Sequence, residues 1–181
     1  MAMKVGIDSY CFHRYFGEVY GHQTPPPFNM TVFDFLDFAK EMDVDGVSLE
    51  SCFFPSYEDA FFADLKARLD EDGFDRVYAW GHPDGLEAGR NEEAFLDMIK
   101  SIEYAAKIGA PVMRICASSF SFRLEPHAPQ MDKLVPWLKE GARVAESYGI
   151  KLAAENHIDY TSSEWLELLE RVDSPYLGLN L

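Results

Sequence analysis

The chain has 181 residues, of which 48% are hydrophobic, and a net charge of -15. This length favours a single domain over residues 1–181, and the apolar content argues against disorder. The negative charge argues against a nucleic-acid partner, because phosphates are bound by Lys and Arg. No apolar run reaches the roughly 18 residues that predict a membrane span.

The amino-terminal segment MAMKVGIDSYCF lacks the apolar stretch and the small-residue cleavage site of a signal peptide. We therefore expect a cytoplasmic protein. The three cysteines, Cys11, Cys52 and Cys116, are an odd number, so we expect reduced thiols rather than a disulfide framework. Their spacing lacks the C-x2-C pattern of a zinc site, and small buried thiols are the expected state.

Short apolar runs recur along the chain and alternate with amphipathic segments. The runs are VGIDSYCF from Val5, GVSLES from Gly46, RVYAWGH from Arg76, PVMRICAS from Pro111, KLAAENH from Lys151 and YLGLNL from Tyr176. Most of them show little strict polar alternation, which suits strands buried on both faces. The sequence therefore predicts about six parallel strands.

Helical patterns separate these strands. They cover residues 31–43, 57–71, 91–108, 132–147 and 161–172, and the second of them is the weakest. Thr31 and Thr161 each begin a capping-box pattern. We expect Asp132 to cap the fourth helix, which would place Pro136 early enough in that helix to be tolerated.

Strands that alternate with helices leave two architectures, a (β/α) barrel and an open doubly wound sheet. The open sheet that binds dinucleotides carries a Gly-rich turn after its first strand, whereas here that strand leads into Asp8-Ser9-Tyr10. We therefore favour an α/β fold of the TIM-barrel type. A full barrel takes roughly 250 residues, so we expect an incomplete barrel: a truncated product or a fragment, or a homo-oligomer or other partner chain covering the edge of the sixth strand.

Catalytic groups of such barrels lie at the carboxyl ends of the strands. Those positions hold Asp8, His13, Glu50, Trp80, His82, Arg114, Ser118, Glu155, Asn156 and His157. Glu155 is the strongest candidate, because a carboxylate in an apolar strand is costly to bury unless it is paired, metal-bound or protonated. The structural alternative is a salt bridge to Arg114, which could also pair with Glu50 or with a substrate anion.

The histidines leave two interpretations open. His82 begins a loop, and two interpretations of it are equally good: an exposed side chain and a residue that contacts substrate. His157 lies two residues after Glu155 and would face the same way in an ideal strand, so a structural and a functional role both remain. The polar, proline-bearing segment 13–30 is either a lid over the barrel mouth or a surface excursion.

The tip AENH, followed by a helix and YLGLNL, resembles the xylose isomerase-like TIM barrels, as do MKVGIDSYCF, DVDGVSLES and KIGAPVMRICAS. The resemblance spans essentially the whole chain. It implies that Glu155 is a catalytic base and a ligand of a divalent metal (Mn, Mg, Co or Zn), and that His82 contacts substrate as a second catalytic residue. We assign substrate binding to Trp80, Arg114, Asn156 and His157.

The resemblance implies an isomerase or epimerase that moves a proton next to the carbonyl of a sugar or sugar phosphate, with metal assistance. The family's further ligands, an Asp, a His and a Glu, have no counterpart up to Leu181, and one carboxylate alone does not hold a hard cation. Two alternatives stay open. One is a lyase or dehydratase of keto-sugars or inososes; the other is an inactive partial barrel that serves as a subunit or scaffold.

Overall fold

The computed structural model of the chain describes residues 3–181. Its strands and α-helices follow in the order β1 (Gly6–Asp8), α1 (Val32–Glu41), β2 (Gly46–Glu50), α2 (Asp59–Asp72), β3 (Asp75–Ala79), α3 (Glu92–Lys107), β4 (Val112–Ile115), α4 (His127–Tyr148), β5 (Lys151–Glu155), α5 (Ser162–Val172) and β6 (Leu177–Asn180). Short 3-10 helices add η1 (Ser9–Phe16), η2 (Ser51–Phe53) and η3 (Phe120–Phe122). None of the helices within residues 3–181 has the length and apolar character that a membrane span requires.

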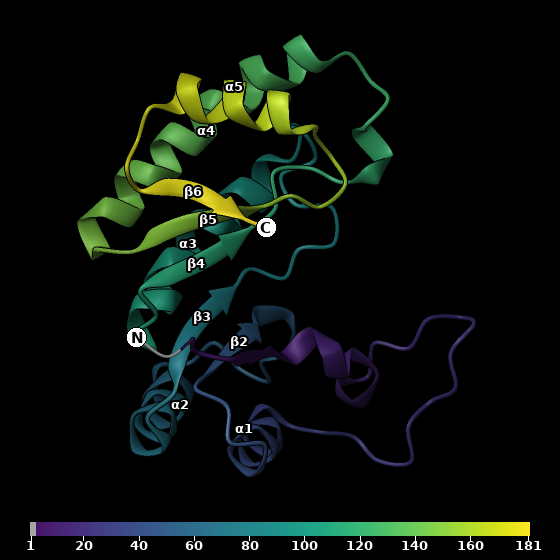
Figure 1. Ribbon diagram of the computed structural model, residues 1–181, viewed down its shortest axis with the longest axis vertical. Coiled ribbons are helices and arrows are strands. Elements are labelled where there is room, and N and C mark those ends of the chain that lie inside the picture. The colour runs from purple at the N-terminus through teal and green to yellow at the C-terminus, as the bar shows by residue number, and fades with distance from the viewer. Residues whose placement is uncertain (1–2) are drawn as a thin grey trace.

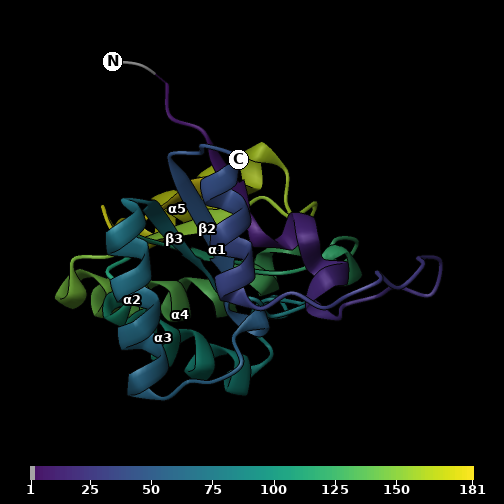
Figure 2. The same cartoon turned by 90° about the horizontal axis from the view of Figure 1, so that it is seen from below.

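The six strands form one parallel sheet in the order β1-β2-β3-β4-β5-β6. Each strand pairs with the next one in sequence, as in a (β/α) barrel and unlike a doubly wound sheet. Figure 1 shows this sheet curved and open, with the helices on its outer side, and Figure 2 shows α1 and α2 covering β2 and β3. The prediction of an incomplete TIM-barrel-type α/β fold is confirmed.

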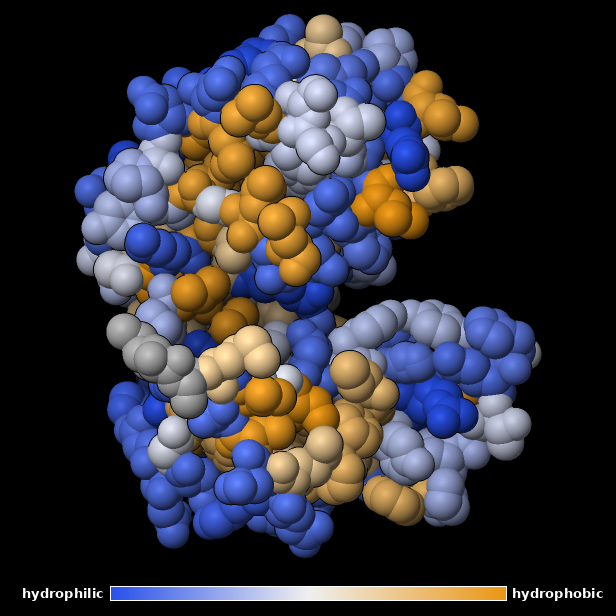
Figure 3. Space-filling model, viewed as in Figure 1, coloured by the Kyte–Doolittle hydropathy of each residue, from blue (hydrophilic) through white to orange (hydrophobic). Residues whose placement is uncertain are grey.

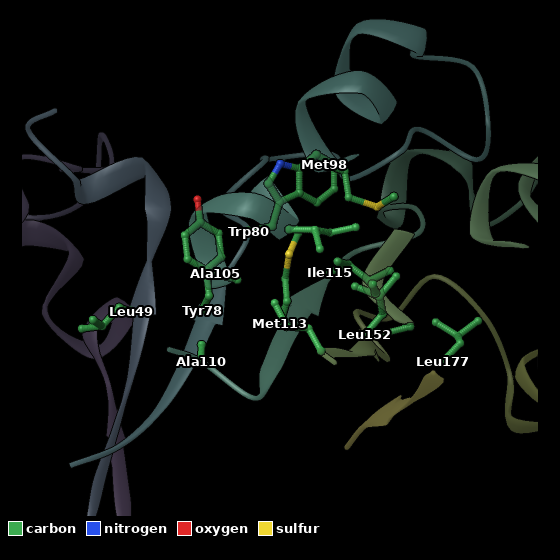
Figure 4. Close-up of a cluster of buried hydrophobic side chains, with 14 of the residues drawn as sticks. Leu49, Tyr78, Trp80, Met98, Ala105, Ala110, Met113, Ile115, Leu152 and Leu177 are labelled. Carbon is green, nitrogen blue, oxygen red and sulfur yellow. The ribbon is translucent and has the colours of Figure 1, made fainter. Parts of the chain in front are cut away.

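One row of apolar side chains joins the sheet to the helices. Successive register partners across β2 to β6 are Leu49, Tyr78, Met113, Leu152 and Leu177. All five are buried, and Met98 and Ala105 of α3 pack into the same core (Figure 4). Because side chains alternate along a strand, the residues that follow this row in β2 and β4 face the opposite, concave side.

Two helices begin as the sequence predicts. The Thr31 side chain accepts a hydrogen bond from the backbone of Asp34, whose carboxylate accepts one from the backbone of Thr31. Thr161 and Glu164 form the same reciprocal pair at the start of α5. Each pair provides acceptors for two backbone N–H groups at the start of a helix, so both capping boxes are confirmed.

The prediction for the fourth helix is wrong at its start. Helix α4 begins at His127, so Asp132 lies within it and pairs with Arg171 at 2.7 Å instead of capping it. Pro136 therefore falls in the helix interior, where proline costs about 3 kcal/mol. Burial of Met131 and Leu134 offsets this cost, because both pack fully into the core.

The first strand is shorter than its apolar run suggests. It ends at Asp8, whose side chain accepts a hydrogen bond from the backbone of Tyr10 at 2.7 Å. This contact starts η1, which continues to Phe16. Segment 13–30, for which a lid and a surface excursion both stay open, therefore begins inside a helix, and the part outside that helix starts at Gly17.

Replacing Leu152 with Ala should lower the free energy of unfolding by about 2–5 kcal/mol, because it leaves a cavity between the sheet and the helices. Urea unfolding followed by circular dichroism measures the change. Leu166→Ala is the matched control, since that side chain is 57% exposed, and it should change the free energy by less than about 0.5 kcal/mol. Equal losses for the two variants would contradict the assigned core.

Candidate functional site

A cavity of about 690 Å³ opens at the carboxyl ends of the strands. Its walls come from the ends of β2 to β5 and from residues 10–20. Figure 3 shows the surface hollowed between the upper part of the molecule and the part built by the early chain. A cavity of about 760 Å³ lies at the amino ends of β1 to β4, but chemistry in such barrels takes place at the carboxyl ends. We therefore place the candidate site in the first cavity.

Arg114 lies at the floor of this cavity between two carboxylates. One terminal nitrogen, Nη1, donates to Oε2 of Glu155, and the other, Nη2, donates to Oε1 of Glu50. The register places Arg114 beside Ala79 on β3 and Ala153 on β5. These small neighbours leave room for the guanidinium. The salt bridge that we gave as the structural alternative for Glu155 is therefore present, and Glu50, the other partner considered for Arg114, joins it.

The three charged groups lie at different depths. The exposed fractions of their side chains are 3% for Glu50, 17% for Arg114 and 24% for Glu155. Charges this far from water must be paired, since an isolated buried ion is costly. One guanidinium offsets one of the two carboxylates, so with both ionised this cluster carries one negative charge. Glu155, the more exposed carboxylate, is the one that a ligand can reach.

The thiols next to these carboxylates stay protonated at neutral pH. Cys116 lies 3.7 Å from Oε2 of Glu155, and burial together with that carboxylate raises the pKa of Cys116 to about 12. Desolvation of the thiol also raises the pKa of Cys52 to about 11, although Cys52, like Cys11, is an exposed residue, so the expectation of buried thiols is wrong for these two. A thiol reacts as its thiolate, so neither cysteine is poised as a nucleophile.

The ring of Trp80 packs against that of His82. The indole Nε1 of Trp80 donates to Asp97 at 2.7 Å, which fixes the ring against α3. The imidazole of His82 stacks on that ring with centroids 5.3 Å apart and planes 19° apart. Both residues line the cavity, and Nδ1 of His82 is buried without a partner. The stacking on Trp80 thus orients the ring of His82 at the cavity.

The other predicted residues divide into those at the cavity and those outside its wall. His157 lines it, two residues beyond the end of β5. Asn156 is not part of the wall; its side-chain oxygen accepts from Nε1 of Trp165 at 3.3 Å, which anchors the turn. Asp8 caps η1, and Ser118 is buried. Substrate binding by Trp80, Arg114, Asn156 and His157 stays a proposal.

An aromatic wall was not predicted. Phe16 and Phe53 stack with centroids 4.5 Å apart, and Tyr10 stacks on Phe53 at 6.3 Å. All three line the cavity. The hydroxyl of Tyr20 hydrogen-bonds that of Tyr10 and ties segment 17–31 to this wall. The sequence feature that could have predicted this wall is the cluster of aromatic residues directly after β1 and β2.

The sequence model described as "Xylose isomerase-like TIM barrel" matches residues 36–181. The chain belongs to this family. The curated C-glycoside deglycosidase alpha subunit of Microbacterium trichothecenolyticum is 31% identical over 137 residues, which cover 71% of this chain and 33% of that protein. The chain thus spans about a third of that relative's length.

Solved structures share the fold. An L-ribulose 3-epimerase superposes with a TM-score of 0.74 at 16% identity, covering 98% of this chain and 60% of that one. The IOLI protein with a bound zinc atom superposes with a TM-score of 0.73 at 14% identity, covering 98% and 62%. Identities this low show the fold alone, and the chain spans about 60% of the epimerase's length.

The metal that the xylose isomerase-like family implies does not fit the described residues by themselves. Among residues 3–181, no group of three or more His, Cys, Asp or Glu side chains is arranged to hold a metal ion. Oε2 of Glu155 already contacts Arg114 and Cys116. A hard divalent cation needs about six oxygen-rich ligands, so Glu155 could supply one of them and the rest would have to come from elsewhere.

Replacing Arg114 with Met should lower the free energy of unfolding by about 3–5 kcal/mol at neutral pH, because it leaves Glu50 buried without its partner. The loss should shrink in acid, where the carboxylates take up protons. Urea unfolding at several pH values measures both effects. Arg143→Met is the matched control: its ion pair with Glu140 is exposed and should contribute less than about 1 kcal/mol. A loss no larger than that of the control would refute the pairing.

Proposed function

We propose that this chain acts as an isomerase or epimerase that transfers a proton next to the carbonyl group of a sugar-like substrate. The observation that carries the proposal is Glu155, a partly exposed carboxylate held at the floor of a cavity by Arg114. A positioned carboxylate of this kind serves as a general base. Membership in the xylose isomerase-like family supports the same reaction class.

Each residue has one task in the proposed reaction. Glu155 removes the proton from the carbon beside the carbonyl, and the electron pair of that C–H bond passes into an enediolate. Once Glu155 carries the proton and is neutral, the guanidinium of Arg114, which is fixed in advance, offsets the negative charge of the enediolate. His82 and His157 hydrogen-bond the substrate hydroxyls. Return of a proton to the same carbon from a second acid on the opposite face gives the epimer. Return of the proton by Glu155 to the neighbouring carbon, while the hydroxyl proton of the first carbon passes to the former carbonyl oxygen, gives the isomer.

The charge of the cavity favours a neutral sugar over a sugar phosphate. Its walls carry the three carboxylates of Glu18, Glu50 and Glu155, against the single guanidinium of Arg114. That guanidinium is already shared by two of them. A phosphate entering the cavity would meet net negative charge and would lack the free Arg or Lys that usually binds it.

A second candidate is a lyase that cleaves a keto-sugar glycoside after the same proton removal. The curated relative is named a C-glycoside deglycosidase alpha subunit, and the aromatic wall of Tyr10, Phe16 and Phe53 offers ring faces beside the carboxylates. Release of an aromatic group from a keto-glycoside, without epimerisation of free ketoses, would favour this candidate. Absence of both reactions would leave the scaffold role.

Replacing Glu155 with Gln should lower turnover by at least about 100-fold, because the amide cannot accept the proton. The assay follows L-ribulose in deuterated water by NMR and measures both epimer formation and deuterium uptake at carbon. Glu170→Gln is the matched control, since that side chain is exposed on α5, and it should leave the rate unchanged. A fully active Glu155→Gln variant would remove Glu155 from the reaction.

We further propose that another polypeptide segment or chain covers the edge of β6. Within residues 3–181 that strand pairs on one side only, with β5, and an uncovered parallel edge favours association. We expect light scattering after size exclusion to give a mass well above the 20.6 kDa of one chain. A monodisperse monomer that stays soluble on concentration would contradict the proposal for this chain alone.

A further inference from the structure

The turn between β5 and α5, residues 156–160, contains a buried acid that the proposed reaction does not use. Asp159 is 2% exposed, whereas Asn156, His157 and Ile158 before it are exposed. Oδ1 of Asp159 accepts from the backbone nitrogen of Tyr160 at 2.9 Å. Its other oxygen, Oδ2, is buried without a hydrogen-bond partner. Keeping this carboxylate buried costs free energy when it is charged.

The same turn is strained. Ile158 has a φ of 56°, a left-handed conformation that β-branched residues rarely adopt. Its side chain is 57% exposed, so apolar burial does not compensate for the strain. A backbone of this kind persists only where its surroundings fix it. A modest change in the cost of burying Asp159 can therefore move the turn.

Contacts of the next residue, Tyr160, hold the turn in its observed position, which we call closed. The hydroxyl of Tyr160 donates to Oε1 of Gln130 at 2.8 Å. Nε2 of Gln130 donates to the backbone oxygens of Phe122 at 3.0 Å and Glu125 at 3.2 Å. This network joins the turn to the loop that precedes α4. On the near side of the turn, His157 lines the cavity.

Three titratable side chains interact electrostatically with Asp159: Cys116 from the end of β4, His157 in the turn and Tyr160 before α5. Burial raises the pKa of Asp159 to about 6, and backbone N–H groups and the charge of His157 act against this rise. Burial also raises the pKa values of Cys116 and Tyr160. Those two groups therefore stay neutral near pH 6, where Asp159 changes its charge.

We infer that Asp159 is a positioning residue whose neutral form keeps the turn closed with His157 at the cavity, and whose ionised form favours an open, hydrated turn. The direction follows from linkage: the closed turn binds the proton of Asp159 more tightly than the open turn does, so opening becomes easier as pH rises through the closed-state pKa. The inference deepens the proposed function, on which its consequence for substrate contact rests.

Hydrogen exchange of the backbone amides of residues 156–161, in the full chain and corrected by unfolded reference peptides, tests this inference without any turnover. At about pH 7.5, Asp159→Asn should slow exchange by up to about 100-fold, the limit set by an acid whose pKa rises from its ordinary value to about 6. At about pH 5 the slowing of exchange by Asp159→Asn should be about tenfold smaller. Asp173→Asn, at an exposed acid after α5, should leave exchange unchanged.

Two further measurements keep the result decisive. If Asp159→Asn does not fold, the corrected opening of the wild-type turn should still rise about tenfold between pH 5 and 7.5. In His157→Gln this pH dependence should persist, because it belongs to Asp159. Exchange in Asp159→Asn that equals or exceeds the wild-type rate, a flat wild-type profile, or loss of the pH dependence in His157→Gln would each overturn the inference. None of these results depends on the reaction assigned to the cavity.

Discussion

The carboxyl-terminal face of the sheet depends on one guanidinium that two carboxylates share. Glu50 is almost completely buried and Glu155 is partly open to the cavity, and Arg114 contacts both. Successive side chains of a strand point to opposite faces of the sheet, and this separates the cluster from the core. Met113 points to the helices, and Arg114, the next residue, points to the concave side. Core and site are thus set by the same register.

This arrangement decides which chemistry the described residues support. Glu155 has a positive partner on one side and the cavity on the other, so it stays in place with an oxygen within reach of a ligand. His82 is held by Trp80, which Asp97 fixes in turn. Such support holds the carboxylate of Glu155 and the imidazole of His82 in position, and correct positioning is a condition for catalysis. The aromatic wall supplies ring faces for the remainder of a larger substrate.

Much of the fold could be predicted from the sequence, because buried parallel strands read as apolar runs and capping boxes are local signals. The pairing of Arg114 with Glu155 was also within reach, since adjacent strands bring their ends together. Glu50 was considered as another partner of Arg114, but the sequence did not show that both carboxylates bind the guanidinium at once, because this depends on how deeply Glu50, 64 positions away, is buried. The burial of Asp159 and the start of α4 were missed for a related reason: tertiary packing, not local pattern, decides both.

A double-mutant cycle between Arg114 and Glu155 tests the central claim most directly. It compares the free energies of unfolding of the wild type, Arg114→Met, Glu155→Gln and the double variant at neutral pH. The shared guanidinium predicts a coupling energy of at least about 1 kcal/mol between the two residues. Additivity within about 0.3–0.5 kcal/mol would mean that they act independently, and the arrangement described for the cavity floor would then be wrong.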